Sequence, residues 1–541
     1  LFQAEDGIRD PESCLVGSEM CIRDRHRSVR SARTRRWPIA CGSAPHPSRH
    51  LAAYTARVPE TPLPDPTLLN RPGEACGVFG IFAPGAETAR LTYFGLFALQ
   101  HRGQESAGIA VSDRETLTVF KDLGLVAQVF DETTLSALHG DIAIGHTRYS
   151  TTGSSVWENS QPVYRQIDAN GIALTHNGNL TNTGELAERI GKLFATTDSE
   201  LMTEAIAQAM SIHNLTLPNA LMRTLPAFRG AFTLAIMDRD TLVGVRDPHG
   251  FRPLCLGRQE HGWVIASETA ALDILGAEFI REVEPGEMVV VDAAGIRSMR
   301  PFSTPEPNLC LFEFVYFARP DSTLYGHNIH AARRRMGEQL AAQAPAVADV
   351  VVPVPESGIP AAQGYAAESG IPFRDGLVKN RYVGRTFIQP AQSMRDRGIR
   401  MKLNAMPGEL RGRRVVLVDD SIVRGSTTRQ LVTMAREAGA TEIHLRISSP
   451  PYRWPCFYGM DTGTRSELLA ANLTVEEVRE FTGADTLSYL PLDSLIEATG
   501  AVTAGFCHAC LTGEYPVEIP TRVAKYVLEL DGPDSESADR M

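Results

Sequence analysis

Residues 415–428 read VVLVDDSIVRGSTT, and this stretch decides the fold of the second half of the chain. An apolar run ends in two adjacent carboxylates, Asp419 and Asp420, and a loop rich in glycine and hydroxyl groups follows. Such runs are typical of strands buried in a parallel sheet. Backbone N–H groups at the loop and at the start of the next helix can hold a phosphate. If the strand is still extended there, the two carboxylates point to opposite sides, so one can contact sugar hydroxyls and the other Mg²⁺.

The sequence on both sides of this stretch alternates between strand and helix patterns. DVVVPVP (349–355) is a second apolar run of the buried-strand type, and TRQLVTMAREAGA (428–440) has a helical pattern. The pattern covers residues 305 to 515, which we therefore expect to form a doubly wound parallel α/β domain.

The 415–428 stretch closely resembles the signature with which type I phosphoribosyltransferases bind phosphoribosylpyrophosphate (PRPP). The resemblance implies that Asp419 and Asp420 hold the ribose and Mg²⁺, and that the loop and helix start hold the 5′-phosphate. The loop residues concerned are Ser421, Arg424, Gly425, Ser426, Thr427 and Thr428.

Two further segments resemble parts of the same family. PVPESGIPAA (353–362) resembles its pyrophosphate loop, with Ser357 at a metal-associated position. KNRYVGRTFIQP (379–390), with Lys379 and Arg385, resembles the mobile lid that closes over PRPP. A basic surface loop is the alternative interpretation of this second segment. Closure of a lid would keep water away from the reacting sugar.

The first half of the chain, up to about residue 300, has short apolar runs bounded by turn residues. Five of these runs are predicted to be strands: CGVFGIFA (76–83), DIAIGHTRYST (141–151), GIALTHNGNL (171–180), AFTLAIMD (231–238) and GWVIASE (262–268). SELMTEAIAQAMSIH (199–213) is predicted to be a helix. The mixture indicates an α+β domain of stacked sheets covered by helices.

Polar clusters at the strand ends, together with EACGVFG (74–80), resemble the N-terminal-nucleophile glutaminase domain of class II glutamine amidotransferases, over most of 76–300. The resemblance implies the following roles: Cys76 as nucleophile, Arg148 for the glutamine α-carboxylate, Asp198 for the α-ammonium, and the Asn177 amide with the Gly178 N–H as an oxyanion hole. A surface salt bridge for Arg148 and a helix N-cap for Asp198 are the structural alternatives. His101, His146 and His176 are expected to be structural.

The proposed nucleophile needs a base, and that need predicts a processed chain. A thiol with a pKa near 8.5 is mostly protonated at neutral pH, whereas an α-amino group with a pKa of about 7.7–8.0 can take its proton. Cys76 would therefore have to be the first residue, so residues 1–75 are expected to be a non-native leader or propeptide. Residues 4–24 resemble a translated sequencing adapter. Residues 25–58 carry eight arginines and no acid, which favours an upstream frame translated by mistake over a transit peptide.

The nine cysteines are too widely spaced for a disulfide framework and indicate a reducing compartment. Cys507 and Cys510 form a Cys-x₂-Cys pair, half of a metal site. Iron–sulfur-containing amidophosphoribosyltransferases carry cysteines in the contexts of Cys310, Cys456 and this pair, which implies a [4Fe–4S] cluster with these four ligands. Zinc is the alternative ion, and a set of buried thiols without any metal is the structural alternative. Cys255 is expected to be a core residue.

The whole of 76–515 resembles the amidophosphoribosyltransferases, whose members combine a glutaminase with a PRPP-binding domain. The resemblance implies transfer of ammonia from glutamine to PRPP at the start of purine synthesis, inhibition by purine nucleotides, a homotetramer and a cytoplasmic location. The formal net charge of −11 argues against nucleic acid as a partner, and no apolar run approaches the roughly 18 residues of a membrane helix. Residues 516–541 are predicted to be an acidic tail, disordered at its end.

Three other functions are open. Another class II amidotransferase, such as asparagine synthetase or glucosamine-phosphate synthase, would lack the PRPP signature at 415–428. A phosphoribosyltransferase with an inactive glutaminase would use ammonia alone. A non-enzymatic PRPP sensor is the third, and the negative charge argues against a DNA-binding regulator of that kind.

Overall fold

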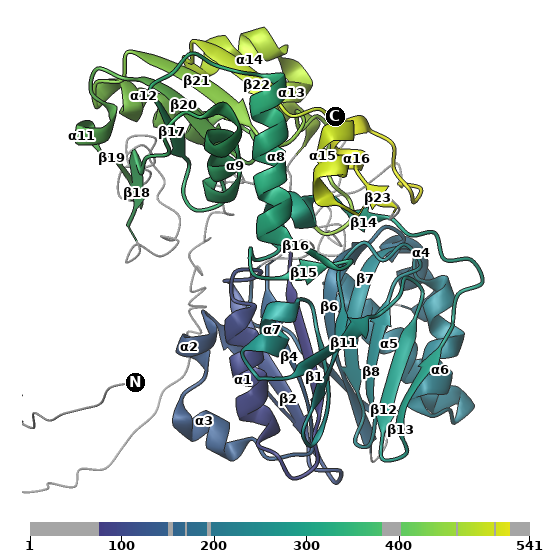
Figure 1. Ribbon diagram of the computed structural model, residues 1–541. Helices are drawn as coiled ribbons and strands as arrows, with labels where there is room; N and C mark the ends of the chain where they lie inside the picture. Colours follow the sequence, from purple (N-terminus) through teal and green to yellow (C-terminus); the bar gives the residue numbers. More distant parts are fainter. Residues whose placement is uncertain are drawn as a thin grey trace, which may run out of the picture. The chain divides into compact units, whose positions relative to one another are not determined.

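The computed structural model describes residues 75–149, 155–167, 170–191, 196–380, 402–460, 464–501 and 505–519 (Figure 1). All of these lie within one compact unit, Pro64–Met541. Arg385 with most of the expected lid, the leader up to residue 74, and the tail from residue 520 lie outside the described residues. None of the described helices is long and apolar enough to cross a lipid bilayer.

The first sheet has seven antiparallel strands in the order β11-β9-β10-β1-β4-β2-β3. Their bounds are β1 Gly77–Phe82, β2 Ser106–Ser112, β3 Leu117–Leu123, β4 Ile142–Arg148, β9 Cys255–Gln259, β10 Gly262–Ala266 and β11 Glu278–Glu282. Gly77 pairs with Thr147, so the start of β1 lies beside the end of β4. This register places Cys76 next to Arg148.

The second sheet has six antiparallel strands in the order β13-β12-β8-β7-β6-β5. Their bounds are β5 Val163–Ile167, β6 Asn170–Leu180, β7 Gly230–Met237, β8 Leu242–Arg246, β12 Met288–Asp292 and β13 Gly295–Met299. The long strand β6 carries Asn177 and Gly178.

The two sheets stack face to face, and helices cover their outer faces (Figure 1). Apolar side chains of both sheets, such as Val78 and Ala235, form the core between them. The helices of this half are α1 Thr88–Ala98, α2 Val126–Val129, α3 Glu132–Ala137, α4 Thr183–Ile190, α5 Asp198–His213, α6 Leu217–Thr224 and α7 Thr269–Asp273. The predicted stacked-sheet arrangement is therefore confirmed. The N-cap of α5 is Thr197 and not Asp198. The alternative prediction that Asp198 is a helix N-cap is therefore wrong.

The second half is built on a parallel sheet in the order β17-β20-β21-β22. Its strands are β17 Val350–Pro353, β20 Arg414–Asp419, β21 Glu442–Ile447 and β22 Thr486–Tyr489, and its longer helices are α8 Ile329–Gln343, α9 Ile359–Ser369, α12 Ser426–Glu437, α14 Val475–Thr482 and α15 Leu492–Thr499. Alternate residues of β20 enter different cores: Val416 packs with residues of α8 and α9, and Val415 with residues of α12 and α14. Both faces of the sheet are covered, as predicted for a doubly wound fold.

Small elements complete the second half. They are β14 Leu309–Cys310, β15 Thr323–Leu324, β16 His327–Asn328, β18 Leu377–Lys379, β19 Leu403–Ala405, α11 Pro407–Leu410, α13 Leu469–Asn472, β23 Phe506–Cys507 and α16 Ala509–Thr512. Strands β14 and β23 pair in parallel, which sets Cys310 opposite Cys507.

A π-helix, Glu313–Phe317, links the two halves through a buried ion pair. The Glu313 carboxylate accepts hydrogen bonds from Arg102 at 2.8 and 3.0 Å and from Arg252 at 3.2 Å, and all three side chains are fully buried. Arg102 also donates from Nε to the backbone oxygen of Cys76 at 3.1 Å. The backbone at the start of β1 is thereby tied to a segment of the second half.

Candidate active sites

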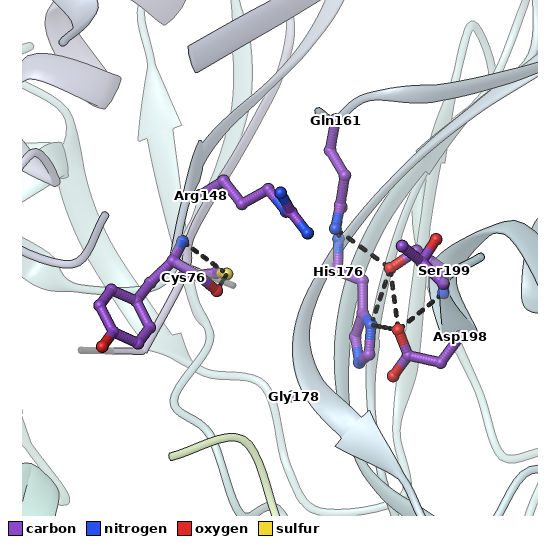
Figure 2. Close-up of a pocket in the computed structure, with 9 residues that line it drawn as sticks. Cys76, Arg148, Gln161, His176, Gly178, Asp198 and Ser199 are labelled. Atoms are coloured by element: carbon purple, nitrogen blue, oxygen red, sulfur yellow. Dashed lines mark hydrogen bonds and ion pairs between the residues drawn. The ribbon is translucent and has the colours of Figure 1, made fainter. Parts of the chain in front are cut away.

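One pocket of the first half gathers four of the residues expected to act on glutamine (Figure 2). Its lining consists of Cys76, Arg148, Tyr149, Gln161, His176, Gly178, Thr197, Asp198 and Ser199. The side chains come from the start of β1, the end of β4, strand β6 and the start of α5. The stacked sheets and the start of α5 thus bring a thiol, a guanidinium and a carboxylate to one small cavity.

The thiol of Cys76 is buried against the peptide of Tyr149. The Tyr149 N–H donates to Sγ at 3.4 Å, and the thiol donates to the Tyr149 oxygen at 3.3 Å. Burial raises the pKa of the Cys76 thiol to about 11, so it is protonated at neutral pH in this chain. The backbone nitrogen of Cys76 is in a peptide bond with Ala75, which is itself buried. A nucleophilic role therefore requires a base that the peptide-bonded nitrogen cannot supply.

The two residues expected to form an oxyanion hole are neighbours in β6, and Gly178 lines the pocket whereas Asn177 does not. Asn177 is fully buried, and neither its amide nitrogen nor its amide oxygen has a hydrogen-bond partner among the described groups. A buried amide without a hydrogen-bond partner lowers the stability of the folded protein by about 1–3 kcal/mol. A ligand that accepts a hydrogen bond from the amide could offset this cost. Gly178 lines the pocket with φ +151°, and a Cβ there would lie 2.1 Å from the oxygen of Ala231. Only glycine fits this position.

Replacing Asn177 with alanine is expected to lower kcat for glutamine hydrolysis by about 10²–10³-fold, because one oxyanion donor is typically worth that much. The KM for glutamine should change little, since the amide would act on the transition state. Steady-state glutamate release measures both constants. Asn182→Ala, at the N-cap of α4 away from the pocket, is the matched control. A normal kcat in Asn177→Ala would remove this residue from the oxyanion hole.

Asp198 is the first residue of α5 and keeps its charge in the pocket. Its carboxylate accepts hydrogen bonds from the N–H groups of Leu180 at 3.1 Å and Ser199 at 2.8 Å. Burial alone would raise the pKa of Asp198, but the nearby charge of His176 and these hydrogen bonds outweigh it and lower the pKa. An ionised carboxylate at this point suits a cationic ligand group.

The sequence did not point to the hydrogen-bonded set around Asp198. Gln161 accepts from the His176 N–H at 2.7 Å and donates to the Ser199 hydroxyl at 3.1 Å, and His176 Nδ1 lies 3.1 Å from the same hydroxyl. Figure 2 shows these side chains side by side with Asp198. No motif marks Gln161 or Ser199. His176, expected to be structural, lines the pocket and lies 3.7 Å from Asp198.

The other two histidines do not line the pocket. The ring of His146 lies 3.0 Å from the oxygen of His176, and burial lowers the pKa of His146 to about 3. The ring of His101 lies 2.7 Å from the buried carboxylate of Glu268. Both contacts agree with the expected structural role.

The carboxylates of the second candidate site lie at the end of β20. Asp419 is the last residue of the strand and Asp420 the first of the loop, and both are buried. Asp420 Oδ1 accepts from the Ser421 hydroxyl at 2.5 Å, whereas Oδ2 has no hydrogen-bond partner among the described groups. Hard oxygen donors of this kind suit Mg²⁺, which usually takes one or two carboxylates and completes its shell with water and substrate phosphate.

The loop after these carboxylates turns sharply into α12. Gly425, at the N-cap of α12, has φ +74°, and a Cβ there would lie 2.4 Å from Leu469. Ser426, Thr427 and Thr428 form the first turn of α12, whose N–H groups donate to no N-cap side chain because Gly425 has none. Helix starts of this kind can bind phosphate through their N–H groups. Arg424, however, is ion-paired with Glu467 at 2.6 Å, so its expected phosphate contact stays a prediction.

The segment that resembles a pyrophosphate loop lies beside the same strand end. The Val354 N–H donates to the oxygen of Val418 at 2.8 Å, and a Cβ on Gly358 would approach that oxygen to 2.6 Å. Ser357 is therefore held next to the carboxyl end of β20. Lys379, at the end of β18, makes an ion pair with Glu356 of this loop at 3.2 Å.

A second pocket gathers the four cysteines expected to bind metal. It is lined by Phe251, Cys310, Cys456, Tyr458, Met460, Cys507, Ala509, Cys510 and Tyr515. Burial raises the pKa of Cys310 to about 11 and raises the pKa of the other three thiols as well. Cys255 lies apart in β9, where its thiol donates to the Ala266 oxygen at 3.3 Å, as expected for a core residue.

The four thiols line one cavity without forming a site for a single metal ion. In the part of the chain that the structure describes, no three His, Cys, Asp or Glu side chains converge closely enough for a single metal ion. Zinc requires such convergence, with Zn–S distances of about 2.3 Å. Both the cluster and zinc therefore stay predictions for this cavity.

Known proteins resemble this chain along most of its length. It matches the glutamine amidotransferase domain over residues 146–274 and the phosphoribosyl transferase domain over residues 322–448. It is 54% identical over 478 residues to an amidophosphoribosyltransferase of Mycobacterium tuberculosis, covering 85% of this chain and 90% of that one. The Bacillus subtilis amidophosphoribosyltransferase is 48% identical over 455 residues, covering 82% and 95%. A solved structure of the B. subtilis glutamine PRPP amidotransferase complexed with ADP and GMP has a TM-score of 0.78 and 46% identity, covering 83% and 99%.

Proposed function

Because the chain belongs to the amidophosphoribosyltransferase family, we propose that its two active-site pockets perform the two half-reactions of that enzyme. The protein is an enzyme of purine biosynthesis that uses glutamine and PRPP. The overall reaction takes glutamine, PRPP and water to 5-phosphoribosylamine, glutamate and pyrophosphate. We assign the glutaminase to residues 76–300 and the PRPP chemistry to residues 305–515.

Cys76 is the nucleophile of the first half-reaction. Its sulfur attacks the side-chain carbonyl carbon of glutamine, the C–N bond breaks, and ammonia leaves with the proton taken from the thiol. Water then hydrolyses the thioester and releases glutamate. The base is the α-amino group of Cys76 itself, which becomes free when the Ala75–Cys76 bond is cut. The Asn177 amide and the Gly178 N–H stabilise the negative charge that develops on the carbonyl oxygen.

Arg148 and Asp198 select glutamine by its α-substituents. The guanidinium of Arg148 can bind the α-carboxylate with two parallel hydrogen bonds, and the ionised Asp198 can bind the α-ammonium. The observation that supports these roles best is that both side chains and the Cys76 thiol line a single pocket.

The second half-reaction joins ammonia to C1 of PRPP. The nitrogen attacks C1, the bond from C1 to the pyrophosphate oxygen breaks, and pyrophosphate leaves. Free ammonia would be protonated and lost in bulk water, so we propose that it travels inside the protein. Asp419 and Asp420 hold the ribose and Mg²⁺, Ser357 assists with the metal, and the loop from Ser421 with the start of α12 holds the 5′-phosphate. Bound Mg²⁺ would offset charge on the leaving group.

Lys379 and Arg385 belong to the basic segment proposed to close over PRPP. Purine nucleotides carry a ribose phosphate like that of PRPP, and the B. subtilis relative is complexed with ADP and GMP. We therefore propose such nucleotides as inhibitors of this enzyme. The chain is also proposed to assemble as a homotetramer, which sedimentation would test.

The function is tested by pyrophosphate release from PRPP with either nitrogen donor. Both glutamine and ammonium salts should support release, and glutamate should appear only with glutamine. Pyrophosphate release with ammonium salts but not with glutamine would instead indicate a phosphoribosyltransferase whose glutaminase is inactive. No release with either donor would reject the enzyme.

Cys310, Cys456, Cys507 and Cys510 are proposed to ligate a [4Fe–4S] cluster. Its role would be structural, joining the C-terminal segment to the rest of the molecule. Free buried thiols and such a cluster both suit a reducing compartment such as the cytoplasm.

Replacing Cys507 with serine is expected to reduce the bound iron to background and to remove the visible absorbance of the purified protein. Iron and zinc analysis with an absorbance spectrum provides the measurement. Cys255→Ser is the matched control, because Cys255 is equally buried but lies outside the cavity, and it should retain full iron. Zinc in place of iron in the parent protein, or full iron in Cys507→Ser, would contradict the cluster.

A further inference from the structure

A loop of the second half, residues 456–460, packs against the strand that carries the proposed oxyanion hole. Asn179 Nδ2, on β6, donates to the oxygen of Phe457 at 3.1 Å. The backbone oxygen of Tyr458 accepts a hydrogen bond from Arg252 Nη2 at 3.1 Å. The ring of Tyr458 stacks on the ring of Phe251, with the centroids 4.4 Å apart. Both halves of the molecule therefore contribute to this contact.

Two glycine backbones also lie close together in this contact. Gly459 has φ +99°, and a Cβ there would lie 3.0–3.1 Å from the Cα, carbonyl carbon and oxygen of Gly178. Such distances are tighter than ordinary contacts, and the atoms met are backbone atoms that cannot swing aside. Figure 2 shows a yellow-green ribbon of the later chain below the Gly178 label.

The two edges of β6 have strand partners over different lengths. Strand β7 pairs with β6 from residue 173 to residue 180, including Gly178 opposite Phe232. On the other edge, β5 pairs only with residues 170–174. The peptides from Asn177 to Asn179 therefore have a described strand partner on one side, while the 456–460 loop meets them through Phe457 and Gly459.

We propose that Gly459 is a positioning residue for the glutaminase: its backbone holds the Gly178 peptide in the orientation that the oxyanion hole needs. The inference rests on the proposed role of Gly178. The glutaminase site is then completed by the half of the chain that binds PRPP. The same loop begins at Cys456, whose sulfur accepts from the Tyr458 N–H at 3.4 Å, so one short loop serves both the cysteine cavity and the oxyanion peptide.

The test is the substitution Gly459→Ala in the full-length processed enzyme. The new methyl group should displace the Gly178 peptide, so kcat for glutamine hydrolysis should fall by at least about tenfold. Complete removal of an oxyanion donor typically lowers kcat by about 10²–10³-fold, and a displaced donor should lose part of that effect. The KM for glutamine should change less than threefold, because Arg148 and Asp198 are untouched. Ammonia-dependent pyrophosphate release should remain within about twofold of the parent enzyme.

Two further variants separate positioning from general damage. Gly370→Ala is the matched control: Gly370 also lies in the second half, at φ +70°, but no atom lies within 4 Å of a Cβ placed there. It should leave both activities unchanged. Asn179→Ala, which removes the bond to Phe457, should lower glutamine kcat selectively, in the same direction as Gly459→Ala.

The proposal is overturned if Gly459→Ala keeps its glutamine kcat, or if it loses both activities equally while Asn179→Ala has no effect. This failure can be distinguished from failure of the oxyanion assignment itself. If only the positioning role of Gly459 is wrong, Asn177→Ala would still be impaired in glutamine hydrolysis. If the oxyanion assignment itself is wrong, Asn177→Ala would have a normal kcat as well.

Discussion

Replacing Cys76 with serine is expected to lower glutamine-dependent synthesis by roughly 10⁴-fold or more, while ammonia-dependent synthesis continues at close to the parent rate. A serine hydroxyl in this buried pocket is far harder to ionise than a thiol, so no thioester can form. The pocket around Cys76 contains none of the residues assigned to PRPP. The substitution therefore separates the two half-reactions.

Glutamate release and pyrophosphate release, each measured with glutamine and with ammonium chloride, provide the readouts for Cys76→Ser. Cys255→Ser is the matched control, because it makes the same atomic change at a buried thiol in β9. Full glutamine activity in Cys76→Ser would show that the nucleophile is another group. Equal loss with both nitrogen donors would show that Cys76 is needed for the fold instead.

Replacing Asp420 with asparagine is expected to lower pyrophosphate release by roughly 10²–10³-fold with either nitrogen donor, because several kcal/mol of metal-assisted charge stabilisation would be lost. Asparagine keeps the size of the side chain and removes its charge. The buried Oδ2 of Asp420, which has no hydrogen-bond partner among the described groups, is the atom whose charge matters most in this interpretation.

The assay for Asp420→Asn is pyrophosphate release with ammonia at increasing Mg²⁺ and PRPP. Asp493→Asn, at an exposed carboxylate in the first turn of α15, is the control and should behave like the parent. The glutaminase pocket should still hydrolyse glutamine in the Asp420 variant. A normal rate of pyrophosphate release would remove this carboxylate from the PRPP site.

The sequence predicted the framework of both halves because hydrophobic patterning is local. The runs that became β1, β6, β7 and β20 are apolar and bounded by turn residues, so each could be recognised without its neighbours. Cys76 and Arg148 also lie at the ends of paired strands, which brings them into one pocket.

Contacts between distant segments could not be predicted in the same way. Gln161 lies in no motif, and only the folded chain brings it against His176 and Ser199. The ion pair between Arg424 and Glu467 and the approach of Gly459 to Gly178 likewise join segments that no local pattern connects.

The cysteines illustrate the same limit. The Cys507 and Cys510 pair is visible in the sequence, but its partners are not. Cys310 meets Cys507 only because β14 and β23 pair in parallel, although these strands are far apart in the chain. Periodicity carries no information about such a pairing, so the four-cysteine set could be expected from family resemblance alone.

The central claim is that one residue supplies both the sulfur that attacks glutamine and the amine that activates it. The most direct measurement compares glutamine hydrolysis by two chains, one beginning at Cys76 and one retaining Ala75 ahead of it, with each N-terminus verified by intact mass. The mechanism predicts that only the chain beginning at Cys76 hydrolyses glutamine at an appreciable rate. Equal rates from the two chains would contradict it.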